Sequence, residues 1–219
     1  MSDFILYSYF RSSASYRVRI GLALKGIEYE YRPVHLLESG GQQKSDEYRA
    51  MNPSAQVPTL VHRGRALGQS LAILQYLDDV VPEPALFPRD PFLRAQVVQA
   101  CEIVNSGIQP LGNLSVLQEL ERRHGWGPEA KVEWTAHWVE VGFRSLEGFL
   151  TKTASAFCFG NEPGAADAFL VPQVAIALRH HVALDAYPLI GKIYQNCLSL
   201  DAVQRAHPDA QPDSPPRTA

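Results

Sequence analysis

The chain has 219 residues, of which 46% are hydrophobic, and its formal net charge is −3, so it has enough apolar material for one large or two small globular domains. The small net charge gives no reason to expect binding to nucleic acid or to a membrane surface. No apolar run approaches the ~20 residues that cross a bilayer, and the N-terminus lacks a basic segment followed by a signal-type apolar run. We therefore expect a cytoplasmic protein.

The first third of the chain alternates between strand and helix patterns. Residues 3–8 are predicted to form a strand, residues 15–25 a helix and residues 29–34 a second strand. Gly26 is a suitable helix terminator because glycine adopts the left-handed conformation without strain. A helix that connects two strands in this way makes them parallel, so the segment is predicted to form a βαβ unit.

A polar loop at residues 38–43 and a short helix around residues 45–50 follow. The third strand is predicted to start at Val57, with Pro58 at its beginning. Proline cannot donate to a sheet ladder, so Pro58 suits an edge, a strand end or a cis bend.

Residues 65–67 are predicted to return as a fourth, antiparallel strand. Residues 70–77 form an apolar-rich helix, with Ser70 at its N-terminus. The order βαβαββα defines an α/β domain over residues 1–80.

Strand patterns stop after a proline-dense segment at residues 81–89, which is predicted to be a linker because proline disrupts helices. The remainder, residues 90–219, is predicted to be an all-helical domain. Its helices are expected at residues 90–111, 129–152, 165–180 and 188–199, and residues 208–219 are expected to form a loosely held tail.

The turn between the first strand and the first helix carries an unusual number of hydroxyls and arginines. The hydroxyls are those of Ser12, Ser13 and Ser15, and the arginines are Arg11, Arg17 and Arg19. One interpretation is an ordinary helix cap, because a serine oxygen accepts hydrogen bonds from the free amides of a first turn. The other is an anion or thiolate site, which the same amides and nearby positive charge would favour.

Metal and thiol chemistry have little support in the sequence. His180 and His181 are adjacent and point in different directions on a helix, so no metal site is expected. Cys101, Cys158 and Cys197 have no CxxC spacing and are expected to be buried and inert in a reducing compartment.

Several segments together resemble one known family, the zeta class of glutathione transferases, which includes the maleylacetoacetate isomerases. The matching segments are Ser12-Ser13-Ala14-Ser15-Tyr16-Arg17-Val18-Arg19-Ile20, Gly40-Gly41-Gln42-Gln43, Gln56-Val57-Pro58-Thr59-Leu60, Gln69-Ser70-Leu71-Ala72-Ile73, Ile108-Gln109-Pro110-Leu111, Asn113-Leu114-Ser115-Val116-Leu117, Leu170-Val171-Pro172-Gln173-Val174 and Gln211-Pro212-Asp213. The resemblance implies a thioredoxin-like domain followed by a helical bundle, glutathione as cofactor, and a homodimer.

The resemblance also implies roles for individual residues. Ser12 and Ser13 would be the catalytic donors that stabilise the glutathione thiolate. The residues implied to bind glutathione are Ser12, Ser13, Gln43, Val57, Pro58, Gln69, Ser70, Gln109, Asn113 and Ser115. The backbone of Val57 would pair with the cysteinyl part of glutathione. Gln69 and Ser70 would hold its γ-glutamyl carboxylate at a helix N-terminus, although Ser70 alone could be an ordinary cap.

The substrate implied by the resemblance is the small dicarboxylate maleylacetoacetate. It would be isomerised from cis to trans by thiolate addition, bond rotation and elimination. Arg11 and Arg179 would bind its carboxylates, because guanidinium groups match carboxylates in geometry, although Arg179 could equally be a solvated helix residue. The alternatives are a maleylpyruvate isomerase, a general transferase for halo acids and other small electrophiles, and a non-catalytic glutathione-binding protein.

The sequence departs from the zeta class at two positions. Ala14 stands where the class most often has cysteine, which removes a thiol from the turn. Gly164 stands where the start of a later helix usually has serine or threonine. Asp167 is present three residues on and is expected to bond back to the free amides there.

Overall fold

The structure is a computed structural model of the chain and describes residues 3–216. The chain divides into two compact units. The first unit comprises Met1–Leu86 together with Ser199–Ala219, and the second comprises Phe87–Leu198.

The first unit is built on a four-stranded mixed sheet of order β2-β1-β3-β4. Its strands are β1 (Phe4–Ser8), β2 (Glu30–Pro33), β3 (Thr59–His62) and β4 (Arg65–Gly68). β1 is parallel to β2, while β3 is antiparallel to both β1 and β4. The predicted βαβ unit and the antiparallel fourth strand are both confirmed.

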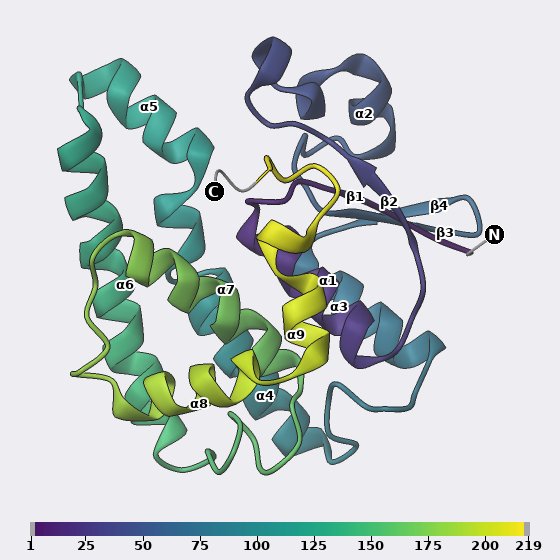
Figure 1. Ribbon diagram of the computed structural model, residues 1–219, viewed down its shortest axis with the longest axis vertical. Coiled ribbons are helices and arrows are strands. Elements are labelled where there is room, and N and C mark those ends of the chain that lie inside the picture. The colour runs from purple at the N-terminus through teal and green to yellow at the C-terminus, as the bar shows by residue number, and fades with distance from the viewer. Residues whose placement is uncertain (1–2, 217–219) are drawn as a thin grey trace. The chain divides into compact units, whose positions relative to one another are not determined.

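Helices cover both faces of this sheet. They are α1 (Ser13–Leu24), α2 (Asp46–Met51) and α3 (Ser70–Val80), accompanied by the short 3₁₀ turns η1 (Glu38–Gly40) and η2 (Gln42–Lys44). α1 and α3 lie on one face and α2 on the other (Figure 1). A buried ion pair between Lys25 Nζ and Asp78 Oδ1, at 2.9 Å, ties the end of α1 to α3. The arrangement is that of a thioredoxin-like domain.

The strand register brings four separate chain segments to one edge of the sheet. Ser8 at the end of β1 pairs with Pro33 at the end of β2. At the same edge, Tyr7 pairs with Thr59, which begins β3, and Thr59 pairs with Gly68 at the end of β4. The segments at residues 9–12, 34–44, 52–58 and 69–70 therefore all adjoin this edge.

The second unit is helical. Its elements are α4 (Pro91–Asn105), η3 (Gln109–Gly112), α5 (Leu114–His124), α6 (Pro128–Leu150), α7 (Ala165–Arg179) and α8 (Pro188–Leu198). α7 is almost entirely buried from Ala165 to Val174 and packs against α4 and α8. The prediction of an α/β domain followed by a helical region is confirmed.

The first helix of this unit is shorter than predicted. Residues 90–111 were expected to be one helix, but α4 ends at Asn105 and a 3₁₀ turn begins at Gln109. Pro110 lacks the amide that a continuing helix needs. α5 was not predicted. None of its residues is buried, and its polar and charged side chains outnumber its apolar ones.

The C-terminal segment belongs to the first unit, which corrects the expected domain boundary. Residues 90–219 were expected to form one helical domain, but the chain from Ser199 onward groups with the sheet. It contains α9 (Asp201–Ala206), which packs on α1, and the short turn η4 (Pro208–Ala210).

The tail is also held more firmly than expected. Gln211 is buried and its Nε2 donates to the carbonyl oxygens of Arg205 and His207, both at 2.9 Å. Sequence patterns do not detect such ties. The expectation of a loose tail is therefore wrong for the segment around Gln211, and residues 217–219 lie outside the described residues.

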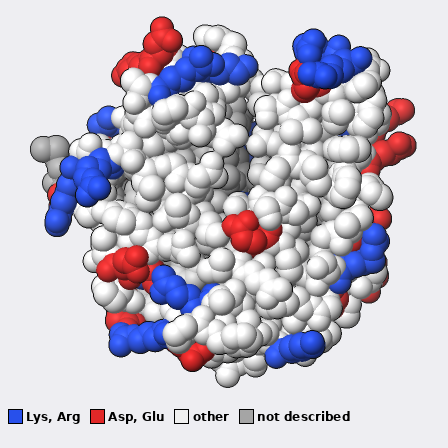
Figure 2. Space-filling view, turned by 180° about the vertical axis from the view of Figure 1, so that it is seen from behind, with Lys and Arg blue, Asp and Glu red and all other residues white. Residues whose placement is uncertain are grey.

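Within residues 3–216, no helix is both long enough and apolar enough to cross a membrane. Figure 2 shows lysine, arginine and carboxylate side chains interspersed over the face that it presents.

Candidate functional site

Ser12 caps α1 and leaves donors exposed at its start. Its Oγ accepts from the amide of Ser15 at 3.2 Å, and its own amide donates to the carbonyl oxygen of Tyr9 at 3.0 Å. Because the Ser12 hydroxyl accepts here, its hydrogen remains available to donate. The amides of Ser13 and Ala14 lie in the first turn, where no intrahelical acceptor exists. Capping and anion stabilisation are therefore compatible at this turn.

The three arginines near this turn differ in their surroundings. Arg11 is exposed, whereas Arg17 and Arg19 are buried at 1% and 0% exposure. Arg19 donates to the carbonyl oxygens of Phe10 and Ala206, both at 3.0 Å. Burial lowers the pKa of Arg19. Arg19 therefore has a structural role, because it connects the turn before α1 to α9.

Arg17, in the second turn of α1, connects that helix to the start of α3. Its Nη1 donates to Ser70 Oγ at 3.2 Å, and both side chains are buried. The N-cap of α3 is Gln69, with a φ of 68°, so Ser70 is the first helical residue and not the cap. A non-glycine residue in the left-handed region is strained, and such strain is concentrated at functional sites. The start of α3 therefore offers a serine hydroxyl, free first-turn amides and a buried cation to an anion.

The Val57-Pro58 bond is cis, as the position of Pro58 before β3 allowed. Within the described residues, the backbone N–H and C=O of Val57 have no hydrogen-bond partner. The preceding carbonyl, that of Gln56, accepts from Tyr48 Oη at 2.8 Å and from Asn52 Nδ2 at 2.9 Å. The turn is thus braced from one side, and Val57 retains the backbone groups with which an extended peptide could pair.

Gln43 is buried beside the same edge. Its Nε2 donates weakly to the carbonyl oxygen of Leu36 at 3.4 Å. Its Oε1 is buried and has no hydrogen-bond partner among the described residues. Buried polar atoms are rarely left unpaired, so Gln43 Oε1 fits a hydrogen-bond donor brought by a ligand.

The four candidates of the second unit lie near helix or turn ends. Gln109 was expected to lie on the first long helix, but it begins the separate 3₁₀ turn η3. Asn113 caps α5, with Oδ1 accepting from the exposed Ser115 amide at 3.4 Å. Arg179 is exposed at the end of α7. Their roles toward a ligand remain expectations from the resemblance.

Three residues of the first unit that sequence reasoning left without a role support the Ser12 turn. Asp213 accepts from the Phe10 amide at 3.0 Å and from Tyr31 Oη at 2.6 Å. Tyr9 and His35 contact each other beside that turn. The Gln211-Pro212-Asp213 segment resembles the family, but no local pattern indicates that Asp213 bonds to Phe10, 203 residues away in the sequence.

Metal ligands and reactive thiols do not add to the candidate site. Residues 3–216 hold no group of three or more histidine, cysteine or acidic residues that could bind a metal ion. Cys101, Cys158 and Cys197 are buried. Burial raises the pKa of both Cys158 and Cys197, so these two thiols are poor nucleophiles.

Comparisons with known proteins agree with this architecture. Residues 11–80 match the family model described as the glutathione S-transferase N-terminal domain. A rat protein named maleylacetoacetate isomerase is 49% identical over 211 residues, covering 96% of this chain and 95% of its own. A Pseudomonas aeruginosa protein of the same name is 44% identical over 96% of this chain and 98% of its own.

Solved structures give the same result. A bacterial maleyl pyruvate isomerase, described as a zeta-class glutathione S-transferase in its holo form, has a TM-score of 0.92 and 39% identity, with coverage of 96% of this chain and 100% of that chain. The maleylacetoacetate isomerase of Anaeromyxobacter dehalogenans with glutathione bound in its active site has a TM-score of 0.86 and 43% identity, covering 97% and 98% of the two chains.

Proposed function

Because the chain belongs to the zeta-class glutathione transferases, in the maleylacetoacetate isomerase family, we propose that it isomerises maleylacetoacetate to fumarylacetoacetate with glutathione. The observation that carries this proposal is the Ser12 turn, which offers a hydroxyl and two first-turn amides without a thiol or imidazole of its own. Such a turn can stabilise a sulfur anion but supplies no nucleophile. The nucleophile must then come from the ligand.

Glutathione fits the polar groups gathered at this edge of the first unit. Its γ-glutamyl carboxylate suits Ser70 and the free amides that begin α3, since an anion is favoured at a helix N-terminus. Its peptide groups suit the unpaired backbone of Val57, and an amide N–H suits the unpaired Gln43 Oε1. These three anchors support a bound peptide whose thiol lies near Ser12.

When bound, glutathione supplies the thiolate whose addition converts the cis double bond of the substrate into a single bond that can rotate before the thiolate leaves. A free thiol has a pKa near ~8.5, so most of it is protonated at neutral pH. By donating hydrogen bonds to the thiolate, Ser12 and the first-turn amides lower that pKa. Ser13, next to Ser12, is proposed as a second donor. Arg11 and Arg179 are exposed guanidinium groups that we assign to the substrate carboxylates.

Gln109, Asn113 and Ser115 are retained as proposed ligand contacts of the second unit. Support for them comes from the resemblance, in which the segments around Ile108-Gln109 and Asn113-Leu114-Ser115 match the family.

One assay tests the proposed function directly. Purified protein is given maleylacetoacetate or maleylpyruvate, each with and without glutathione, and the trans products are measured. We expect glutathione-dependent turnover of maleylacetoacetate. Absence of turnover with both substrates would contradict the proposal and leave a non-catalytic glutathione-binding protein or a transferase for halo acids and other electrophiles.

Maleylpyruvate isomerisation is the second candidate, because one of the most similar solved structures carries that name. Both substrates are dianions with a cis double bond, so the same donors and arginines serve either one. The assay separates them by the ratio of the two kcat/KM values.

Replacing Arg17 with methionine is expected to raise the KM for glutathione several-fold while changing kcat less. The Arg17 guanidinium donates to Ser70 Oγ, which leaves the Ser70 hydroxyl hydrogen to donate to the ligand carboxylate. Methionine keeps much of the buried volume but removes the donor and the charge. Steady-state kinetics with glutathione as the varied substrate measures the split, and R17K, which keeps the charge, is the matched control. Equal changes in kcat and KM would contradict this role.

Replacing Arg179 with alanine is expected to raise the KM for the dianionic substrate more than the KM for glutathione. A guanidinium–carboxylate contact is charge-assisted, and losing one costs about 1.5–3 kcal/mol, or roughly ten- to a hundredfold. Kinetics with each substrate varied in turn measures the two constants. Similar changes in both would indicate that Arg179 supports the fold of α7 instead.

Two further assignments follow from family membership. We propose that the protein is cytoplasmic. We also propose that it acts as a homodimer, and sedimentation velocity on the purified protein tests this second assignment.

A further inference from the structure

His35 lies where the loop after β2 begins, and it joins the two ends of that loop. Its amide donates to Gln42 Oε1 at 2.8 Å, and its carbonyl oxygen accepts from the Gln42 amide at 2.9 Å. Its ring Nδ1 accepts from the amides of Leu37 at 3.3 Å and Glu38 at 2.9 Å. The imidazole thus caps the turn η1 as a side-chain oxygen caps a helix.

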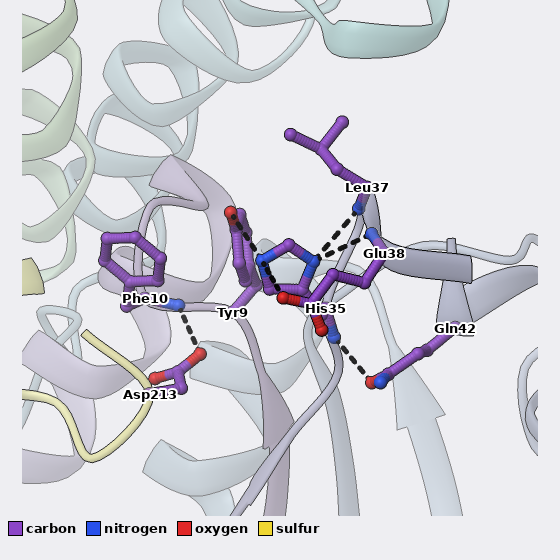
Figure 3. A network of polar contacts seen from close by, with 7 residues as sticks. All are labelled: Tyr9, Phe10, His35, Leu37, Glu38, Gln42 and Asp213. Atoms are coloured by element: carbon purple, nitrogen blue, oxygen red, sulfur yellow. Dashed lines mark hydrogen bonds and ion pairs between the residues drawn. The ribbon is translucent and has the colours of Figure 1, made fainter. Parts of the chain in front are cut away.

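The two amides fix how the neutral ring carries its proton. Because Nδ1 accepts, the hydrogen of a neutral ring is on Nε2. Nε2 faces Tyr9 Oη at 3.5 Å and Glu38 Oε1 at 3.7 Å, and the Tyr9 and His35 rings meet edge to face (Figure 3). Both ring nitrogens are therefore engaged only in this tautomer.

His35 connects two walls of the proposed glutathione site. The carbonyl oxygen of Tyr9 accepts from the Ser12 amide at 3.0 Å, so the Tyr9 contact reaches the turn that holds the thiolate donor. Gln42, bonded twice to His35, immediately precedes Gln43, whose Oε1 is unpaired.

The loop needs such a brace because Ser39, next to two glycines that tolerate positive φ, has an unfavourable backbone conformation. Ser39 has a φ of 53°, and Gly40 and Gly41 have φ values of 79° and 101°. A non-glycine residue in the left-handed region is strained, and it persists only when its surroundings hold it. The His35 ring, through Leu37 and Glu38, supplies that hold on the N-terminal side of Ser39.

We propose that His35 is a positioning residue for glutathione, which holds the loop of residues 36–44 in its binding conformation only while its imidazole is neutral. This inference rests on the proposed function. Glutathione affinity is accordingly expected to fall as the pH is lowered. The cause is a change in the conformation of the loop and not a change in the ionisation of glutathione.

Protonation acts directly on the cap. A neutral histidine ring takes up a second proton in mildly acidic solution. The doubly protonated ring has no acceptor, so an Nδ1 hydrogen then faces the two amide hydrogens of Leu37 and Glu38. The cap is lost and the loop loses its connection to the ring.

The groups that face the ring are the Tyr9 hydroxyl and the Glu38 carboxylate. Burial raises the pKa of Tyr9, so its hydroxyl remains protonated across the range tested. Arg11 and Asp213 act on Tyr9 with opposite signs. The Glu38 carboxylate lies 3.7 Å from Nε2, where it faces the charge of a protonated ring but offers no acceptor to the two amides at Nδ1.

S-methylglutathione is the probe that tests this inference, because its thioether cannot ionise and the Ser12 turn then does not contribute a pH dependence. Isothermal titration measures its Kd at pH 8 and pH 5. We expect the Kd of the unchanged protein to rise about tenfold or more, as losing a pair of hydrogen bonds implies. A Kd that does not change with pH would overturn the inference.

H35N is the matched variant, since Asn Oδ1 occupies the position of His Nδ1 and accepts from the same amides without titrating. Its Kd is expected to stay near that of the unchanged protein at pH 8 and to remain there at pH 5. H35A, which has no acceptor, is expected to bind weakly at both pH values. If H35N shows the same rise as the unchanged protein, His35 is not the source and the inference fails.

A second readout needs no variant. Hydrogen exchange of the peptide that covers residues 36–44, corrected for intrinsic pH dependence, is expected to speed up at pH 5 while peptides from α1 do not change. Unchanged protection there would also overturn the inference. Failure of S-methylglutathione to bind at pH 8 would overturn the glutathione site and this inference together, whereas pH-independent binding would overturn this inference alone.

Discussion

Replacing Ser12 with alanine is expected to lower kcat for the isomerisation by roughly 10²-fold or more, the usual effect of removing one donor that stabilises a developing anion. The reason is that the Ser12 hydroxyl accepts from the Ser15 amide, so its own hydrogen remains available for the glutathione sulfur. Steady-state kinetics measures the loss. The ultraviolet absorbance of the bound thiolate, followed against pH, is expected to show a raised thiol pKa in the variant.

Ser12 also caps α1, so the variant needs a control that separates capping from catalysis. Alanine at an N-cap costs about 1 kcal/mol of stability, whereas glycine costs only a few tenths. S12G is therefore expected to be nearly as stable as the unchanged protein but as slow as S12A. Turnover of S12G close to that of the unchanged protein would remove the Ser12 hydroxyl from the mechanism.

Ala14 contributes a backbone amide, and no side-chain donor, to the Ser12 turn. It lies in the first turn of α1, and its amide is one of the free donors there. A cysteine side chain at this position is not needed for that donation. The departure from the zeta-class pattern thus leaves the proposed thiolate donors intact.

Replacing Asp167 with alanine is expected to destabilise the fold by about 2–6 kcal/mol, since each of two buried amides left without its acceptor costs about 1–3 kcal/mol. Asp167 is 3% exposed and accepts from the amides of Cys158 and Gly164, both at 2.9 Å. The variant leaves these amides without acceptors at the start of the buried helix α7. Urea unfolding followed by circular dichroism measures the loss.

D167N is the matched control because it keeps one oxygen acceptor, and its loss of stability should be smaller than that of D167A. Equal losses in both variants would show that the carboxylate charge, and not the acceptors, matters. The confirmed contact between Asp167 and Gly164 is the one expected from the sequence, even though glycine has no capping side chain.

The stability that Asp167 contributes is also expected to depend on pH. Burial raises the pKa of its carboxyl in the folded protein above the ordinary value. A group whose folded pKa is raised contributes most stability below its unfolded pKa and loses it as the pH rises through the folded pKa. The stability difference between the unchanged protein and D167A should therefore be larger at pH 4 than at pH 7.

Local patterns identified most elements of the fold. Alternation and helical periodicity located the four strands, and Pro58 marked the place where a cis bond was found. The helix around Ala165–Arg179 was also predicted, with Asp167 in its capping role. These features depend on residues within a few positions of one another, which is why the sequence alone could reveal them.

The candidate site was only partly predictable. Ser12, Val57 and Gln69-Ser70 each carry a local signal: a helix start, a turn proline or a helix N-terminus. Their resemblance to a family then assigned them to one ligand. No pattern among neighbouring residues shows that the Arg17 guanidinium contacts Ser70. The sequence therefore indicated anion binding by Ser70 at the start of α3, but not the buried positive charge of Arg17 beside it.

The sequence by itself determined the βαβαββα order of the first 80 residues, a special turn at Pro58 and the serine-rich start of α1. Only the tertiary structure decided that residues from Ser199 onward return to the sheet unit, where Asp213 holds the Phe10 amide before that turn. It also decided that His35 caps a loop beside Gln43 while facing Tyr9. The physical reason is that hydrogen bonds between distant segments depend on strand register and packing, whereas capping and periodicity depend on neighbouring residues.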